Sequence, residues 1–285
     1  MGITPDCTMS TVLYGDLVDH PWRDPHVDES DPYSLFVSRS SALGWLDELG
    51  AGAVGGLWGM NDAGRGAGPA GEDSDEPSAG GGGAADAGPS RIAWFQVAVA
   101  WPFPPGRPLP IQPFLACVGD VVTRIGQARV DAVQLLLPLE VLRACRGAPP
   151  GSGFGPRDGL RSLLQDAQWF VDLPAHAPVV VSATVDAGDA TDVRPIAPGM
   201  RRWMREIRQD VFVCESVADA DGEPTLGTRD DGWPGPSASA HRVAFRGTLA
   251  EWSLDAVGWL AAYLAEAAYY HGLDAPVTLT VRRVD

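Results

Sequence analysis

The stretch HRVAFRGTLAEWSLDAVGWLAAYLAEAAYYHGLDAPVTLTV, residues 241–281, contains the pattern that decides the fold. Its first nine residues alternate between apolar and polar side chains, as those of a half-buried strand do. A long run of alanine, leucine and aromatic residues follows, and Gly272 stands where a helix of that length would end. The final residues alternate again. The stretch therefore predicts a strand, a helix over 252–271 and a second strand, with Thr248 and Glu251 spaced as a capping box.

Three similar but weaker strand–helix–strand units precede this one. The expected strands are residues 33–39, 53–58, 90–101, 131–139, 178–187 and 210–217, the expected helices are 41–50, 113–126 and 200–207, and residues 11–18 are a further candidate strand. Val130-Asp131-Ala132 and Leu273-Asp274-Ala275 follow two of the helices in the same way. Four units taken in pairs predict an α+β fold of two tandem β-α-β-β-α-β domains, the split βαβ or ferredoxin-like arrangement. A single mixed sheet carrying all the strands is the alternative.

The breaker-rich segments set the expected domain boundaries. The first domain is predicted to comprise residues 1–60 and 91–140, interrupted by a flexible acidic Gly/Ala-rich linker at 61–90. A connector with a short helix at 158–166 and a strand at 167–173 should fill residues 141–177. The second domain should cover 178–285, with a flexible loop at 218–239.

Composition excludes several classes of function. The chain has no lysine, so its 21 basic residues are all arginine, against 37 acidic ones. Without an ε-amine it cannot form a Schiff base or supply the lysine of a P-loop or a protein kinase. The formal charge of −16 opposes nucleic-acid binding. The arginine-only, Ala/Gly/Pro-rich usage suggests a high-GC bacterial source.

The four cysteines indicate a reduced, cytoplasmic protein. They are far apart in the sequence and form no CxxC pair. The first residues carry no basic region followed by an apolar one, so no signal peptide is expected. The longest apolar stretch is too short to span a bilayer, so no membrane association is expected either.

Neither a metal nor a cofactor is predicted. The densest group of potential ligands is His20, Asp24 and His26 with the acidic residues up to Asp31. Their spacing matches no established site, and three prolines interrupt the run. A solvated acidic segment is the favoured interpretation.

A helix around residues 200–207 is predicted to present an arginine stripe. Apolar residues at i, i+3, i+4 and i+7 give it a buried face, and the arginines lie beside that face. The candidates for binding an anion or a partner are Arg201, Arg202, Arg205 and Arg208. The stripe suits a carboxylate, a phosphate or an acidic peptide, which includes the chain's own 61–90 linker in cis. An ordinary solvated face is the favoured interpretation, and the anion site is the hypothesis beside it.

Two further groups of residues are candidates for binding. Trp94 and Gln96 share one face of an expected strand and, with polar residues around another strand, are candidates for a ligand pocket: Trp94, Gln96, His241, Arg242 and Arg246. The aromatic residues of the 252–271 helix are candidates for a partner interface: Trp252, Trp259, Tyr263 and Tyr270. The favoured interpretations are a structural role for His241 and intramolecular packing for the aromatic residues, and the binding roles are the hypotheses beside them.

These patterns favour a protein that binds over one that catalyses, namely an accessory, regulatory or immunity-type module with a protein partner. The basis is the missing catalytic signature, the acidic field, the aromatic stripe and the long polar insertions. Paired split βαβ domains also resemble the α+β barrels of small cofactor-independent oxygenases. That resemblance implies the alternative, an oxygenase- or cyclase-type enzyme acting on an apolar small molecule between the sheets.

Overall fold

A computed structural model describes residues 7–22, 31–47, 56–66, 89–100, 107–146, 157–172, 177–189, 191–223, 226 and 239–284. Eight strands and six helices are described. The strands are β1 (Thr8–Asp19), β2 (Trp58–Arg65), β3 (Arg91–Val99), β4 (Gly126–Leu137), β5 (Val179–Asp186), β6 (Phe212–Asp219), β7 (Val243–Leu249) and β8 (Val277–Arg283). The helices are α1 (Pro32–Ala42), α2 (Ile111–Ile125), α3 (Leu139–Arg146), α4 (Arg157–Asp172), α5 (Ala197–Glu206) and α6 (Leu254–Tyr270).

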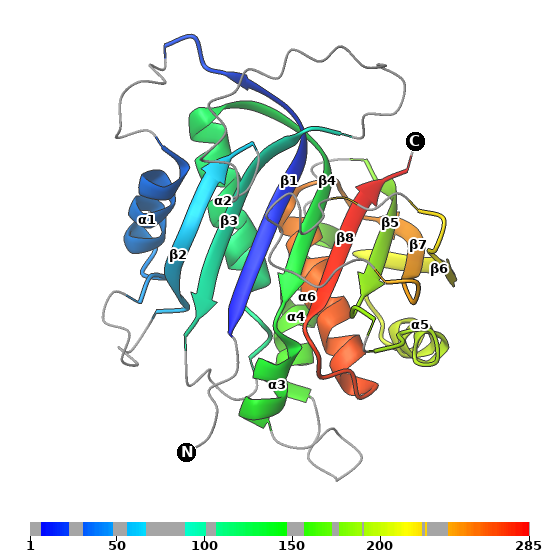
Figure 1. Ribbon diagram of the computed structural model, residues 1–285. Helices are drawn as coiled ribbons and strands as arrows, with labels where there is room; N and C mark the ends of the chain where they lie inside the picture. The colour runs from blue at the N-terminus through cyan, green and yellow to red at the C-terminus, as the bar shows by residue number, and fades with distance from the viewer. Residues whose placement is uncertain are drawn as a thin grey trace.

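All eight strands belong to one antiparallel sheet in the order β2-β3-β1-β4-β8-β5-β7-β6 (Figure 1). The α+β prediction is confirmed at this level. The first four strands occupy one half of the sheet and the last four occupy the other. The halves meet where β4 pairs with β8 over six residue pairs, from Ala132 opposite Arg282 to Leu137 opposite Val277. The strands therefore lie edge to edge in one continuous sheet.

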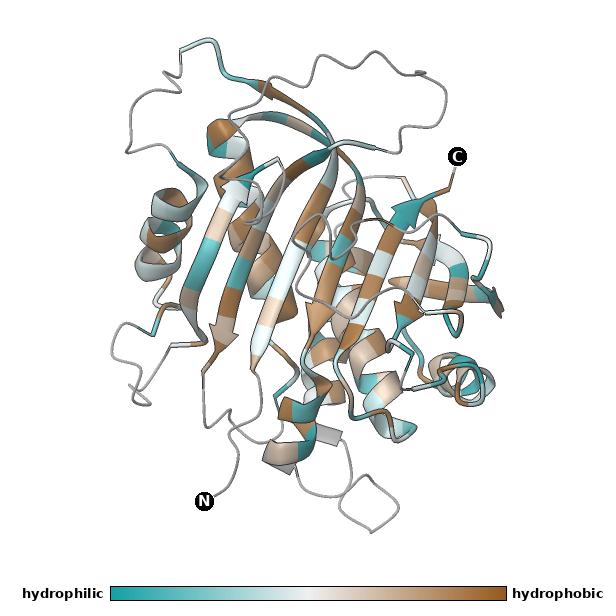
Figure 2. Cartoon of the chain, viewed as in Figure 1, coloured by the Kyte–Doolittle hydropathy of each residue, from teal (hydrophilic) through white to brown (hydrophobic). Residues whose placement is uncertain are grey.

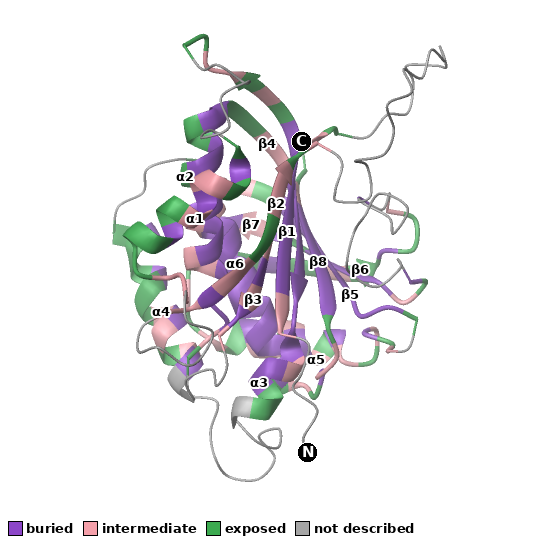
Figure 3. Ribbon diagram, turned by 60° about the vertical axis from the view of Figure 1, so that its left-hand side comes forward, coloured by how far each residue is buried: buried purple, intermediate pink, exposed green. Residues whose placement is uncertain are grey.

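The helices cover one face of this sheet, and none of the described helices lies on the other face (Figure 3). Alternation along the strands fits the arrangement, since apolar and polar bands alternate along β3 and β8 (Figure 2). On β3, for example, Phe95 and Val97 are buried toward the helices, whereas Trp94 and Gln96 on the opposite face are half-buried. We call the side away from the helices the open face.

Helix α6 lies at the centre of the helical layer. It contacts α2, α3, α4 and α5, and every residue from Ala256 to Tyr269 is buried. The expectation that this helix is apolar on more than one side is therefore explained by packing around its whole circumference. The predicted capping box is wrong. Thr248 is part of β7, and Ser253 is the N-cap, with its hydroxyl accepting a hydrogen bond from the Ala256 N–H.

The beginning of the chain differs most from expectation. Residues 33–39 were predicted as a strand but form most of α1, and the strand that opens the sheet is β1, formed around residues 11–18. Asp31 caps α1 through a 2.8 Å bond from the Ser34 N–H to its carboxylate, and Pro32 fits the first helical position. These end signals outweigh the strand-like composition. Residues 61–65, expected in the linker, complete β2.

An aromatic cluster explains why α1 packs where it does. The Phe36 ring lies 6.2 Å from Trp58, 5.2 Å from Phe95 and 5.8 Å from Phe114, measured between centroids. These rings come from α1, β2, β3 and α2, and all four are fully buried. Tilted and edge-on ring contacts of this kind add to the burial of apolar area. The cluster thus fixes α1 and β2 to the rest of the sheet.

The connector between the halves is helical. Residues 167–173 were predicted as a strand, but α4 continues to Asp172. Leu163, Ala167 and Phe170 are buried at helical spacing, and this period decides against the strand. The Trp259 indole N–H donates to the Leu163 carbonyl at 2.7 Å, which ties α4 to α6.

Both edge strands of the sheet are irregular. The β2–β3 register shifts between Met60 and Asp62, and the β6–β7 register shifts between Cys214 and Ser216. Such bulges bend an edge strand and interrupt its row of backbone groups. The two outermost strands of the sheet therefore both depart from regular pairing.

The closest approach of α2 to α6 gives a prediction. A Cβ atom placed on Gly258 would lie 2.9 Å from the Cα atom of Gln112, a backbone atom that cannot move aside alone. Gly258→Val should therefore force the helices apart and lower the free energy of unfolding by about 1–3 kcal/mol. Urea denaturation measures this change. Gly59→Ala is the control, because only the Asp47 carbonyl at 4.0 Å lies nearby; an unchanged unfolding free energy for Gly258→Val would contradict the α2–α6 contact.

Candidate functional site

Arg201, Arg202 and Arg205 of the predicted arginine stripe lie on α5, near the β6 edge of the sheet (Figure 1). Arg208 lies beyond the helix, because α5 ends at Glu206 and the backbone is extended at Ile207. The buried face of α5 contains Met200 and Met204, as expected. Trp203 is half-buried and packs its ring 5.2 Å from Tyr263 and 5.9 Å from Tyr270. These contacts hold the helix against α6 and direct its arginines outward.

The four arginines of the stripe divide into two kinds. Arg201 is half-buried and donates a hydrogen bond from Nη2 to the main-chain carbonyl of Glu215 in β6. Arg202, Arg205 and Arg208 are exposed, and no carboxylate in the described ranges lies within ion-pairing distance of them. We call these three the α5 arginine surface. Its charge is not neutralised within the described structure.

Six other arginines of the chain are paired, whereas exposed Arg124 and Arg161 each stand alone without a described ion pair. Ion pairs join Arg39 to Asp120, Arg65 to Asp19, Arg129 to Asp131, Arg143 to Asp274, Arg194 to Asp192 and Arg246 to Glu223. A surface ion pair contributes little to stability. The contrast is nevertheless informative, because an acidic chain leaves three neighbouring arginines without such a partner.

The expected ligand pocket is not assembled as one site. Trp94 and Gln96 lie on β3 and Arg246 lies on β7, all on the open face. Five strand spacings, about 24 Å, separate β3 from β7 in the sheet order. The structure therefore places these residues in two separate parts of the open face.

The part around β5 and β7 binds a carboxylate of the chain itself. Glu223 accepts hydrogen bonds from Arg246 Nη2 at 2.9 Å, Thr184 Oγ1 at 2.8 Å and Ser182 Oγ at 3.3 Å. Buried Arg242 donates from Nη2 to the main-chain carbonyl of Glu223 at 3.1 Å. Burial alone would raise the pKa of Glu223, but these hydrogen bonds and the charge of Arg246 outweigh it and lower the pKa below its usual range.

The part around β1 and β4 holds an apolar side chain from the same segment. Leu226 is buried in a cluster that is separate from the main core, with Val12, Tyr14, Ala132, Leu136 and Trp94. The Gln134 side-chain amide donates to the main-chain carbonyl of Leu226 at 2.5 Å. The Tyr14 hydroxyl bonds to the other end of that amide, Oε1, at 2.9 Å. The amide is therefore held with its donor toward Leu226.

The segment between β6 and β7 is fastened to the open face at a third place. The buried carboxylate of Asp186 accepts bonds from the Ser239 N–H at 3.0 Å and from the Ser239 hydroxyl at 2.8 Å. The flexible loop predicted at 218–239 thus has fixed positions at Glu223, Leu226 and Ser239. Residues 224–225 and 227–238 lie outside the described part of the chain.

His241 belongs to a surface ion-pair group. Its Nδ1 lies 2.6 Å from Arg194 Nη2, and Arg194 also binds Asp192. The hydrogen bonds and charge of Arg194 lower the pKa of Asp192 to about 2. His241 is thus held by its neighbours on the approach to β7, away from Trp94 and Gln96.

Packing explains most of the aromatic residues proposed for an interface. Trp259 and Tyr263 are fully buried, and the Tyr263 hydroxyl donates to the Met204 carbonyl at 3.2 Å. Trp252 is half-buried and donates to the Val130 carbonyl at 2.7 Å. A partner has no access to Trp259 or Tyr263 in the folded chain. Tyr270, which is 39% exposed, is the member of the group that a partner can reach.

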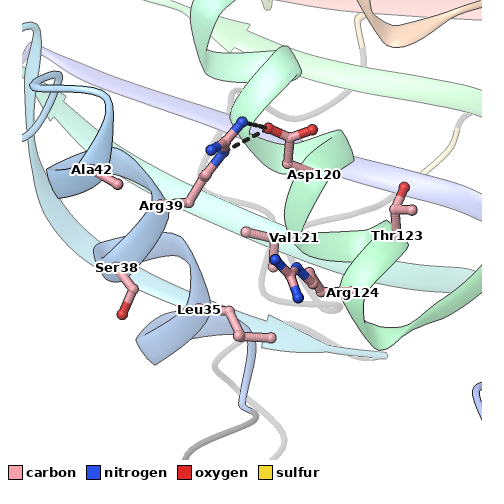
Figure 4. A pocket seen from close by; sticks show the side chains of 8 residues that line it. All are labelled: Leu35, Ser38, Arg39, Ala42, Asp120, Val121, Thr123 and Arg124. Atoms are coloured by element: carbon pink, nitrogen blue, oxygen red, sulfur yellow. Dashed lines mark hydrogen bonds and ion pairs between the residues drawn. The ribbon is translucent and has the colours of Figure 1, made fainter.

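Two grooves flank the outer side of α2. The larger, of about 470 Å³, lies between α1 and α2, and it is lined by Leu35, Ser38, Arg39, Ala42, Asp120, Val121, Thr123 and Arg124. Figure 4 shows the Arg39–Asp120 ion pair bridging the two helices across it. The second, of about 300 Å³, lies between α2 and α6 beside Trp252. Sequence reasoning did not detect either groove, because each forms between helices distant in the chain.

The described ranges contain no cluster of three or more His, Cys, Asp or Glu residues that could hold a metal ion. His20 bonds through Nε2 to the Thr123 carbonyl at 2.9 Å and stacks on Trp22. Asp24 and His26 lie outside the described residues.

Burial raises the pKa of Cys117 to about 11, so this thiol is protonated at neutral pH. None of the described helices is long and apolar enough to cross a bilayer.

Comparisons of this chain with protein-family models, with curated proteins and with solved structures give no match. The two features of the described structure whose chemistry suits binding are the α5 arginine surface and the contacts of Glu223 and Leu226 on the open face.

The carboxylate of Glu223 gives a pH prediction. Folding lowers its pKa below the ordinary value of 4.5, so the ionised form stabilises the folded chain at neutral pH. This contribution is present above pH 4.5 and disappears as the pH falls through the lower pKa of the folded state. Glu223→Gln should reduce the free energy of unfolding by about 1–2 kcal/mol at pH 7. The difference from the unmodified chain should shrink as the pH falls below about 4.5.

Urea denaturation at pH 7, 5 and 3.5 checks this expectation. Glu206→Gln is the matched control, since Glu206 is exposed on α5 and has no described ion pair. A deficit for Glu223→Gln that is the same at all three pH values would show that the ionised carboxylate is not what stabilises the segment.

Proposed function

We propose that this chain is a non-catalytic binding protein of an accessory, regulatory or immunity type, and that it recognises an acidic protein segment through α5. The observation that supports the proposal is the α5 arginine surface, three exposed arginines without a described carboxylate partner on a chain of formal charge −16. Guanidinium groups bind carboxylates through planar, bidentate hydrogen bonds. The carboxylates of an acidic partner would pair with these three guanidinium groups.

The surroundings of α5 favour binding of a partner through the arginine side chains over addition of a partner strand to β6. Arg201 already occupies the carbonyl of Glu215 on the neighbouring edge strand, and β6 is bulged at the same place. A partner strand would meet an irregular edge there. Arg202, Arg205 and Arg208, by contrast, extend into solvent and need no rearrangement to make contact.

The enzyme alternative required a pocket between two facing sheets. In the described structure β4 pairs with β8, so the strands of both halves lie in one layer and enclose no such space. The described grooves lie between helices instead. A small molecule retained through gentle purification, seen by native mass spectrometry, would favour the enzyme; a retained acidic protein would favour the binding function.

The chain's own acidic segment is a less suitable ligand for α5. Residues 67–88 are outside the described structure, and the flanking Gly66 and Ser90 bond to β3 and β1, respectively. Six strand spacings, about 29 Å, separate β3 from β6, and the segment would have to cover this distance twice, once toward α5 and once back. A stretch of this length extends at most about 75 Å, so reaching α5 and returning would leave little slack. A partner in trans has no such limit.

We further propose that the two halves are tandem β-α-β-β-α-β units of the split βαβ, ferredoxin-like kind. In support, the order β2-β3-β1-β4 has the same relation to chain order as β6-β7-β5-β8. One helix follows the first strand of each half and another follows the third. The Asp-Ala pairs at 131–132 and 274–275 do not add to this support, because the first lies within β4 and the second precedes β8.

Charge reversal on α5 tests the binding proposal. Arg202→Glu with Arg205→Glu should weaken binding of a fluorescein-labelled peptide of alternating glutamate and serine by about tenfold, which corresponds to about 1.4 kcal/mol. Fluorescence anisotropy at low salt measures the dissociation constant, and added salt should weaken binding to the unmodified chain. Arg124→Glu with Arg161→Glu is the control of equal charge, because both residues are exposed and without a described ion pair. An equal loss of peptide affinity in both double variants would show that the net charge of the chain, and not the α5 arginine surface, determines binding.

Cutting the chain tests the tandem arrangement. Fragments 1–150 and 151–285 each contain one complete unit, so their co-expression should give a folded complex with a cooperative thermal transition. Fragments 1–104 and 105–285 divide the first unit between β3 and α2, and should give a complex with a clearly lower melting temperature. Circular dichroism melting compares the pairs. Equal tolerance of the two cuts would count against units that end near residue 150.

A further inference from the structure

Part of this chain lies on the open face and makes polar and apolar contacts there. Glu223 and Leu226 come from the segment that follows β6, yet they contact β5 and β7 on one side and β1 and β4 on the other. Their contacts involve side chains from both halves of the sheet.

The first contact is a carboxylate site. Ser182 and Thr184 are buried on β5, and their hydroxyls point to the Glu223 carboxylate together with the guanidinium of Arg246. Arg242 adds a donor to the main-chain carbonyl of the same residue. One ionised group thus meets two hydroxyls and a charged donor, the kind of charge-assisted set that makes the strong hydrogen bonds of proteins.

The second contact recognises an apolar side chain together with its backbone. Leu226 fills the cluster around Val12, Tyr14 and Trp94, and Gln134 donates to the Leu226 carbonyl. The acceptor of the Gln134 amide is a main-chain carbonyl, a group that any peptide offers, and the Tyr14 hydroxyl fixes the orientation of that amide.

The spacing of the two contacts defines the ligand. Gln134 pairs with Thr280 and Thr280 pairs with Thr184, so the sites lie in one row of the sheet, two strands apart. Two strand spacings are about 9.6 Å, and three residues of extended chain span about 10 Å. The site therefore fits a peptide that carries a carboxylate three residues before a leucine-sized side chain.

Two further hydroxyls on the open face have no hydrogen-bond partner among the described residues. Ser10 and Thr278 lie in the next row, on either side of Leu136, and are only 3% and 6% exposed. Within the described part of the chain, no hydrogen-bond partner reaches Ser10 Oγ or Thr278 Oγ1. Buried hydroxyls are normally bonded, and main-chain groups of a bound peptide would supply such partners.

We propose that the open face is a binding site for a segment of a partner protein with this acidic–apolar spacing, and that Glu223 and Leu226 occupy it in cis until the partner competes. This site is independent of the α5 arginine surface. An attached segment competes at a high effective concentration, so a partner binds the free site more tightly than the occupied one. Each partner segment that binds must displace the residues that the chain itself supplies.

The test uses the full chain and a fluorescein-labelled peptide of sequence DADGEPTLGT, which is residues 219–228. Glu223→Ala with Leu226→Ala removes both occupants, so the peptide should bind this variant at least tenfold more tightly than the unmodified chain in fluorescence anisotropy. The matched peptide DADGQPTAGT retains the other acidic residues and should bind at least tenfold more weakly. Equal affinity of the labelled peptide for both proteins would overturn the proposal.

Two more variants show whether the labelled peptide binds to the open face or to the α5 arginine surface. Adding Gln134→Ala to the double variant should abolish the gain, whereas adding Arg202→Glu and Arg205→Glu should leave it unchanged. Loss of the gain with the α5 pair alone would assign the peptide to the α5 arginine surface and overturn the open-face site. Should the double variant not fold, Leu226→Ala carries the test: tighter binding of the peptide supports the site, and unchanged binding overturns it.

Discussion

The structure depends on the burial of α6 around its whole circumference. A helix with no side facing solvent must be covered in every direction, and here the sheet, α2, α3, α4 and α5 provide the cover. Each of its large aromatic residues also needs a partner for its polar atom; Trp259 finds one on α4 and Tyr263 finds one on α5. Gly258 allows α2 to approach closely enough to close the layer. The halves of the chain consequently share one core.

Much of the second half of the fold could be predicted from the sequence, because its signals are local. Strand alternation before and after residues 254–270 and the glycine that ends the helix all act over a few residues. The first half was harder. Residues 33–39 combine aromatic and β-branched residues with a helical burial pattern, and a capping aspartate with a following proline decides between the two. Pairing of β4 with β8 involves residues about 145 positions apart, and no local pattern contains that information.

The candidate sites divide in the same way. The arginines of α5 follow from helical periodicity, because the position of the buried methionines determines which side faces solvent. The contacts of Glu223 and Leu226 could not be found by that reasoning. Their segment is rich in glycine, proline and acid, a composition typical of mobile loops. What holds it are buried residues on strands far away in the sequence, such as Gln134 and Thr184, which become neighbours only when the sheet is complete.

The irregular edge strands have a consequence for how copies of this chain behave at high concentration. An open eight-stranded sheet offers two rims at which another molecule's strand could add, and repeated addition would build fibres. Here the register shifts at Met60 and Asp62 on one rim and at Cys214 and Ser216 on the other. Arg201 also occupies a carbonyl of the second rim. Both edges of the sheet are thus irregular, and this irregularity hinders the addition of strands from other copies of the chain.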